Sequence, residues 1–100
     1  MATRRMRRAS ANVFRDLGFA SEEAENLRIR SELMARLSRV IEDHGLTQRE
    51  AAKLLGVSQP RVSDLVRGKI DLFSIDSLVL MLGRAGVRVT LSTRTRRRVA

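Results

Sequence analysis

The sequence contains no cysteine, and only one histidine, one proline and three aromatic residues occur among its 100 positions. Without cysteine the chain can form neither a disulfide framework nor a cysteine-ligated metal site, which fits a reducing cytoplasm. No apolar run approaches the ~20 residues that span a bilayer. No apolar stretch follows the basic amino terminus, as a signal peptide would require. We therefore expect a small cytoplasmic protein with an aliphatic core and no membrane association.

Groups that commonly carry catalysis are equally scarce. His44 is the one histidine, and it lies at the expected end of a helix, where it is suited to terminal carbonyl groups rather than to a metal. The sequence offers no Ser/His/Asp set, no metal-ligand cluster and no glycine-rich phosphate loop. These absences argue against an enzyme, a metal and a cofactor, and they favour a protein whose function is binding.

Positive charge is abundant and unevenly placed. The formal net charge is +9, yet residues 1–15 and 88–100 together hold ten of the twenty basic residues and none of the eleven acidic ones. Arginine runs at chain ends typically belong to disordered arms that bind phosphate, although they can also serve solubility alone. We expect a disordered basic arm over residues 1–11 and a disordered arginine-rich tail over residues 93–100.

Between these ends, residues 12–92 are predicted to form one mainly α-helical domain with four to five helices. Ser21 can cap a long helix over about residues 22–43, whose apolar side chains recur at helical spacing and whose first turn is acidic. The short apolar segment Asn12–Phe19 should dock on the remainder, because its two phenylalanines would otherwise sit in water.

The last part of this domain is predicted to contain a helix and then a strand. Ser74 can cap a helix over about residues 75–85, with Ile75, Val79 and others inward. Residues 87–92 then alternate strictly between apolar and polar side chains. A lone strand needs a partner, and we favour the same strand of a second copy over the segment near Val13 or another protein's sheet. The apolar residues of this predicted dimer contact are Val87, Val89 and Leu91.

The most informative stretch is Thr47–Gly68, TQREAAKLLGVSQPRVSDLVRG. Thr47 and Glu50 have the spacing of a capping box, and Gly56 stands where a first helix ends in a left-handed residue. Ser58 can cap a second helix, whose first turn tolerates Pro60. Apolar side chains at helical spacing should pack the two helices together, namely Ala51, Leu54, Leu55, Val62, Leu65 and Val66. This pattern is typical of a helix-turn-helix, which places its second helix in the DNA major groove.

At these positions the chain resembles the Xre/Cro-type helix-turn-helix repressors. The resemblance rests on Gln48, Ala52, Gly56, Val57, Ser58, Val62, Ser63 and Leu65. Gln59 is suited to adenine and Arg61 to guanine, whereas Arg67 and Lys69 are placed to touch phosphate. The predicted DNA-contacting set is Gln48, Ser58, Gln59, Arg61, Ser63, Arg67 and Lys69. A two-fold dimer would set two such helices one DNA turn apart on a palindromic operator.

The flanks are similar to a narrower family, the small HigA-like antitoxins. The resemblance rests on NVFRDLGF from Asn12, AENL from Ala24, RSELM from Arg30, GLTQ from Gly45, QPRVSDL from Gln59, and FSIDSL from Phe73. It implies an antitoxin that binds a RelE/HigB-like mRNA-cleaving toxin and represses its own operon as a dimer. The same likeness also places DNA contact on Gln48, Ser58, Gln59, Arg61, Ser63 and Arg67.

Such toxins are basic, and the chain has an acidic region beside apolar anchors near its amino terminus. A basic partner could dock there by charge complementarity around an apolar centre. The candidate toxin-binding residues are Val13, Phe14, Asp16, Leu17, Phe19, Glu22, Glu23 and Glu25. The alternative is that the acids only complement a helix and the apolar residues close the chain's own core. Two other functions stay open, a standalone or phage-type regulator without a toxin and an architectural nucleic-acid protein that acts through its arginine arms.

Overall fold

The computed structural model describes residues 11–95, and within that range it is built from five α-helices and one short 3-10 helix. The elements are α1 (Ala11–Asp16), α2 (Ser21–Asp43), α3 (Gln48–Leu55), α4 (Gln59–Val66), η1 (Ile70–Leu72) and α5 (Ile75–Arg84). The predicted mainly helical fold is thus confirmed. Residues 1–10 and 96–100, which include most of the two expected basic arms, lie outside the described range.

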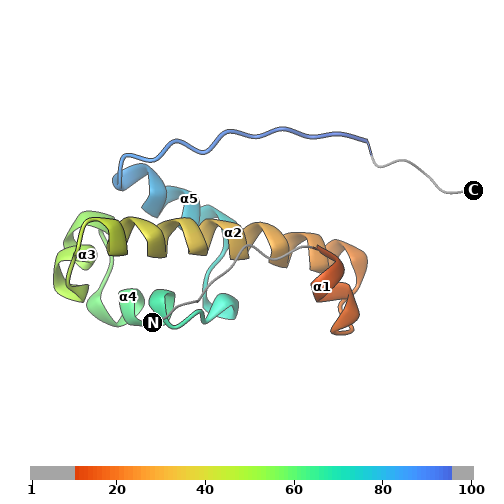
Figure 1. The fold of residues 1–100 in the computed structure, drawn as a ribbon, viewed down its shortest axis with the longest axis horizontal. Coiled ribbons are helices and arrows are strands. Elements are labelled where there is room, and N and C mark those ends of the chain that lie inside the picture. Colours follow the sequence, from red (N-terminus) through yellow and green to blue (C-terminus); the bar gives the residue numbers. More distant parts are fainter. Residues whose placement is uncertain (1–10, 96–100) are drawn as a thin grey trace, which may run out of the picture.

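Helix α2 is the axis around which the other elements are arranged. Figure 1 shows α3, α4 and η1 on one side of α2, α5 on the other, and α1 folded back at its amino-terminal end. The side chains through which α2 packs in the main core are Met34, Leu37 and Ile41. The other buried members of that core are Ala51, Leu55, Val62, Leu65, Phe73, Leu78, Met81 and Leu82. Ala24 and Leu27 are buried nearer the amino terminus of α2, outside this cluster, in the part against which α1 packs.

The start of α2 differs from the prediction. Ser21 was expected to cap the helix, but Ala20 occupies the N-cap position and no side chain bonds the first amides there. Ser21 is the first helical residue instead, with Glu22 and Glu23 following in the first turn. The helix dipole is therefore complemented by these carboxylates rather than by a hydroxyl cap.

Helix α5 begins as predicted. The Ser77 amide donates to the Ser74 hydroxyl (3.1 Å), and the Ser74 amide donates to the Ser77 hydroxyl (3.2 Å). Val79, expected on the inner face, is exposed, and Met81 is buried in its place. The inner face is thus rotated by part of a turn from the predicted one.

The predicted strand over residues 87–92 is not formed in the single chain, since the described residues contain no strand. Val87 and Val89 pack partly buried against the core, whereas Leu91 is 88% exposed. Figure 1 shows this segment running on from α5 without a neighbouring strand. Its backbone lacks the ladder of hydrogen bonds to a neighbouring strand that would make it a strand.

Candidate nucleic-acid interface

The first helix of the motif, α3, begins at a complete capping box. The Glu50 amide donates to the Thr47 hydroxyl (3.1 Å), and the Thr47 amide donates to the Glu50 carboxylate (2.8 Å). Two amides that the helix cannot bond internally are thereby satisfied. The predicted start of the helix-turn-helix is confirmed, and Gln48 stands exposed as the first residue of α3.

The turn depends on Gly56. Its φ is +70° and its ψ +34°, and its amide donates to the Ala52 carbonyl (2.9 Å). The Val57 amide donates to the same carbonyl (3.1 Å), while the Val57 side chain packs against the core. A Cβ at position 56 would lie 2.8 Å from the guanidinium of Arg84, which belongs to α5. The turn between the two motif helices therefore needs glycine for its positive φ, and the Arg84 side chain lies close to the Gly56 backbone.

Helix α4 starts as predicted, because the Ser58 hydroxyl accepts from the Arg61 amide (3.3 Å) and proline lies in the first turn. Val62 and Leu65 are fully buried. Leu54 and Val66 were expected to join them, but both are exposed. Each stands one residue from a buried leucine, and one residue rotates a side chain by ~100° around a helix.

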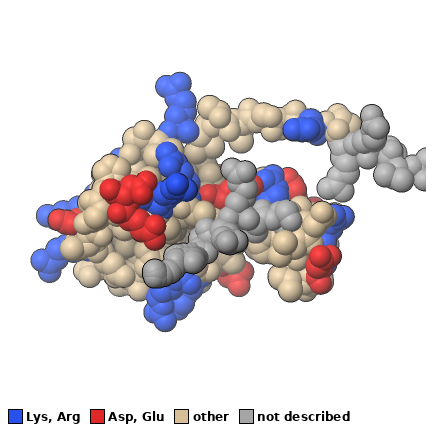
Figure 2. All heavy atoms as spheres, in the orientation of Figure 1, with Lys and Arg blue, Asp and Glu red and all other residues tan. Residues whose placement is uncertain are grey.

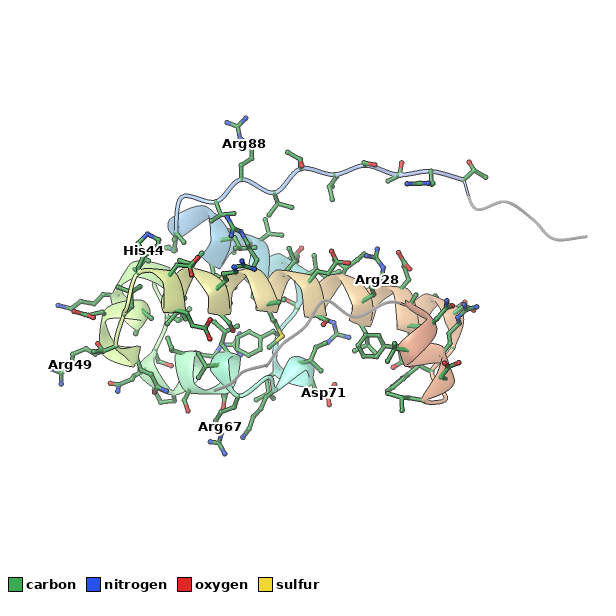
Figure 3. The ribbon with its side chains drawn as sticks, viewed as in Figure 1. Arg28, His44, Arg49, Arg67, Asp71 and Arg88 are labelled. Carbon is green, nitrogen blue, oxygen red and sulfur yellow. The ribbon has the colours of Figure 1, made fainter. Side chains whose placement is uncertain are left out.

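One row of side chains on α4 faces away from the core. Gln59, Ser63 and Arg67 are four residues apart, so they lie above one another on one helix face. Gln59 and Arg67 are exposed and Ser63 is half-buried, and Figure 3 shows Arg67 projecting away from the body of the molecule. Figure 2 shows other basic side chains projecting on the α3 and α4 side. This row, which we call the outer row, is the part of α4 available to a groove.

Two further predicted contacts border this row. Ser58 is exposed at the start of α4, in the position where it caps the helix. Lys69 follows the end of the helix, and its ammonium lies 3.8 Å from the carboxylate of Asp64. The pair is open to solvent, so its attraction is modest and does not prevent Lys69 from approaching a phosphate.

Arg61 does not share the outer row. It follows Gln59 by two residues, which places it ~200° around the helix from that side chain. Its Nη1 donates to the Leu72 carbonyl (2.6 Å), and its Cζ lies 4.1 Å from the centroid of the Phe73 ring. The guanidinium is thus held by the connection that follows α4, an arrangement that the sequence analysis did not anticipate.

A second arginine reaches the same connection from α2. Arg30 Nη1 donates to the carbonyls of Ile70 (3.2 Å) and Phe73 (3.3 Å), and Arg30 Nε donates to the Asn26 side-chain oxygen (2.7 Å). We call Arg30 and Arg61 together the arginine clamp, because from two helices they hold three carbonyls within residues 70–73. Arg30 precedes the two residues whose carbonyls it bonds by about forty positions, so no local pattern could reveal this contact.

The candidate partner surface on α1 is partly as expected. Val13, Leu17 and Phe19 are exposed, and Leu17 is 69% exposed. Phe14 meets Phe19 edge to face, with ring centroids 6.2 Å apart. Asp16, Glu22 and Glu23 are exposed beside them. Val13, Leu17 and Phe19 are therefore open to solvent in the single chain.

Glu25 is committed elsewhere within the chain. Its carboxylate lies 2.7 Å from the guanidinium of Arg28, which also bonds Glu32. The hydrogen bond with Glu25 outweighs partial burial and raises the pKa of Arg28 above its ordinary value. The acidic side of this surface is consequently weaker than the sequence suggests.

The remaining polar groups give no sign of metal chemistry within residues 11–95. No group of three or more histidine, cysteine or acidic side chains there could hold a metal ion. His44 lies at the end of α2 as predicted, with its Nδ1 2.9 Å from the Val40 carbonyl oxygen. Within the same range, no helix has both the length and the apolar composition needed to cross a membrane.

Comparison with known proteins agrees with this geometry. The model of a helix-turn-helix domain family matches residues 13–94. A solved structure described as an XRE-family transcriptional regulator is similar, with 32% sequence identity and a TM-score of 0.71 over 78% of this chain and 91% of that one. No curated protein matches the chain. The family match and the structural relative together show that the chain belongs to the XRE-type helix-turn-helix family, whose characteristic unit binds DNA.

Proposed function

We propose that this chain is a sequence-specific repressor that inserts α4 into the DNA major groove. The observation that carries the proposal is the outer row, which presents Gln59, Ser63 and Arg67 on a helix whose first turn is held by the Ser58 cap and by the Arg61 side chain. Gln59 is suited to a bidentate contact with adenine, and Arg67 to phosphate. The other proposed DNA contacts are Gln48, Ser58 and Lys69.

The proposed repressor acts as a homodimer. Residues 87–92 alternate between apolar and polar side chains as a strand does, but no neighbouring strand is present among the described residues. Leu91 is almost fully exposed. Leu80, on the outer face of α5, is 68% exposed and is not part of the proposed dimer contact. Antiparallel pairing of Val87, Val89 and Leu91 with a second copy would satisfy the strand backbone and give the two-fold symmetry of a palindromic operator.

We further propose that the protein is an antitoxin that neutralises a RelE/HigB-like toxin through the α1 surface. Val13, Leu17 and Phe19 supply an exposed apolar centre, and the neighbouring carboxylates suit a basic partner. The surface lies at the end of α2 remote from α3 (Figure 1). The other candidate is a standalone regulator, which needs the outer row but no α1 partner.

The test is a growth assay with the small reading frame beside this gene. That frame is induced alone, with the wild-type chain, and with two variants that place a charge on an equally exposed leucine, Leu17→Asp and Leu80→Asp. We expect arrest that the wild type and Leu80→Asp relieve and Leu17→Asp does not, because only Leu17 belongs to the α1 surface.

The same variants are assayed for DNA binding by gel shift. Leu17→Asp should bind DNA like the wild type, which shows that its failure to relieve arrest is not misfolding. Arrest that Leu17→Asp also relieves would exclude the α1 surface. Absence of any arrest would remove the antitoxin function and leave the standalone regulator.

A further inference from the structure

We infer that Arg61 is a positioning residue that sets the orientation of α4, acting with Arg30 through residues 70–73, and that it reads no base. The inference rests on the proposed DNA binding and concerns how that binding becomes sequence-specific. It moves base recognition from Arg61 to the outer row, where Gln59 and Ser63 lie.

The first support is the direction of the Arg61 side chain. Two residues separate it from Gln59, and side chains two apart on a helix do not face the same way. Arg61 is half-buried, whereas Gln59 is exposed. A groove that receives Gln59 therefore meets the side of α4 away from Arg61.

The second support is what the Arg61 guanidinium already binds. It donates to the Leu72 carbonyl at 2.6 Å and covers the face of the Phe73 ring at 4.1 Å. A base contact would require it to give up a charge-assisted hydrogen bond and a cation–π contact together. Phe73 is only 1% exposed, so the ring is a fixed part of the core and cannot follow the arginine outward.

The third support is Arg30, which holds the same segment from α2. Its Nη1 bonds the carbonyls of Ile70 and Phe73, on either side of the one that Arg61 bonds. Asn26, one turn earlier on α2, holds the Arg30 guanidinium at Nε. The longest helix of the fold is thereby tied to the recognition helix through three carbonyls.

The consequence for DNA binding follows from the shortness of α4. The helix has eight residues and is buried through only two of them, Val62 and Leu65. These two buried side chains lie on neighbouring turns, and the clamp adds a directional restraint on rotation about the helix axis. A small rotation would misalign the whole outer row with the base edges, so loss of the clamp should weaken binding without altering which bases are preferred.

The experiment selects binding sites from a random duplex DNA library with the wild type, Arg61→Met, Arg61→Lys and Arg30→Met. Affinity for the selected site is then measured over a range of salt, at a temperature at which circular dichroism shows each variant fully folded. Gln59→Ala and Arg67→Ala are the matched controls for a base contact and for a phosphate contact.

For Arg61→Met we expect affinity to fall roughly 5- to 30-fold, with the same preferred bases and the same salt slope. Arg30→Met should act in the same direction. Arg61→Lys should recover part of the loss, because an ammonium can still donate to Leu72 and lie over the ring. Gln59→Ala should lose one base preference in each half-site, and Arg67→Ala should reduce the salt slope by about one.

Loss of a base preference in Arg61→Met would overturn the inference, and so would unchanged affinity in the folded variant, which would make the contact purely structural. If Arg61→Met does not fold, Arg30→Met and Arg61→Lys decide the question by the same criteria. If the wild type enriches no sequence from the library, the proposed function itself is refuted. That result is obtained from the wild type alone, so it is distinguishable from failure of the inference about Arg61.

Discussion

Replacement of Gly56 by alanine tests whether the motif turn depends on its backbone angle. The left-handed conformation costs an L-residue ~1–2 kcal/mol, so Gly56→Ala should lower the free energy of unfolding by about that amount. A Cβ there would also lie 2.8 Å from Cζ and Nη1 of Arg84. Because those atoms end a flexible exposed side chain, moving them should add less than ~0.5 kcal/mol.

Two other glycines separate these contributions. Gly45 has a similar φ of +59° and no neighbouring atom within 4 Å of an added Cβ, so Gly45→Ala should lose the backbone part alone. Gly83 lies inside α5 without a positive φ and also has open space, so Gly83→Ala should gain ~0.5–1 kcal/mol. The double variant Gly56→Ala with Arg84→Ala removes the close approach and isolates any cost of displacing the guanidinium.

The assay is urea unfolding followed by circular dichroism, with the midpoint and slope fitted to a two-state transition. The expected order of stability is Gly83→Ala, wild type, Gly45→Ala and then Gly56→Ala. A Gly56→Ala protein as stable as the wild type would refute the left-handed requirement. If that variant lost more than ~2 kcal/mol beyond Gly45→Ala, the Arg84 side chain would be a rigid part of the turn rather than a mobile neighbour.

Three further changes probe the cap, the core and the dimer. Thr47→Ala should cost ~1 kcal/mol in the same urea assay, because the Glu50 amide loses its acceptor; Glu50 still accepts from the residue 47 amide, so a loss above ~2 kcal/mol would contradict this estimate. Leu82→Ala should cost ~2–5 kcal/mol, since the side chain is fully buried, and a change under 1 kcal/mol would place it outside the core. Leu91→Asp should convert a dimer to a monomer in sedimentation velocity at micromolar concentration, and its unfolding midpoint should be independent of protein concentration, unlike that of a dimer. A wild type that sediments as a monomer would refute the proposed pairing.

The elements that the sequence predicted are those determined by neighbours in the chain. The caps at Thr47, Ser58 and Ser74 and the turn at Gly56 each involve residues within four positions of one another, so their chemistry can be read locally. The predicted cap at Ser21 was wrong by one residue, because local sequence does not distinguish the N-cap position from the first helical residue there.

The features that the sequence did not predict depend on distant residues or on helix rotation. The arginine clamp joins Arg30 to carbonyls of Ile70 and Phe73 across about forty residues, and any of the chain's many arginines could have filled that position. The contacts of Arg61 with Leu72 and Phe73 also went unpredicted, because residue type alone does not give the ~100° rotation per residue that separates Arg61 from Gln59. The ion pair between Glu25 and Arg28 reduces the negative charge of the candidate partner surface near α1, which the sequence analysis had inferred from the carboxylates alone.

The length of α2 has a consequence for how two ligands could share this protein. Its 23 residues extend ~35 Å, and only the portion from Met34 onward enters the main core. The amino-terminal part acts as a spacer that holds α1 away from the outer row. The two proposed sites, α1 for a protein and α4 for DNA, therefore lie toward opposite ends of α2. Any influence of one ligand on the other must then be transmitted through the body of the protein, and Asn26 and Arg30 lie on α2 between the two sites.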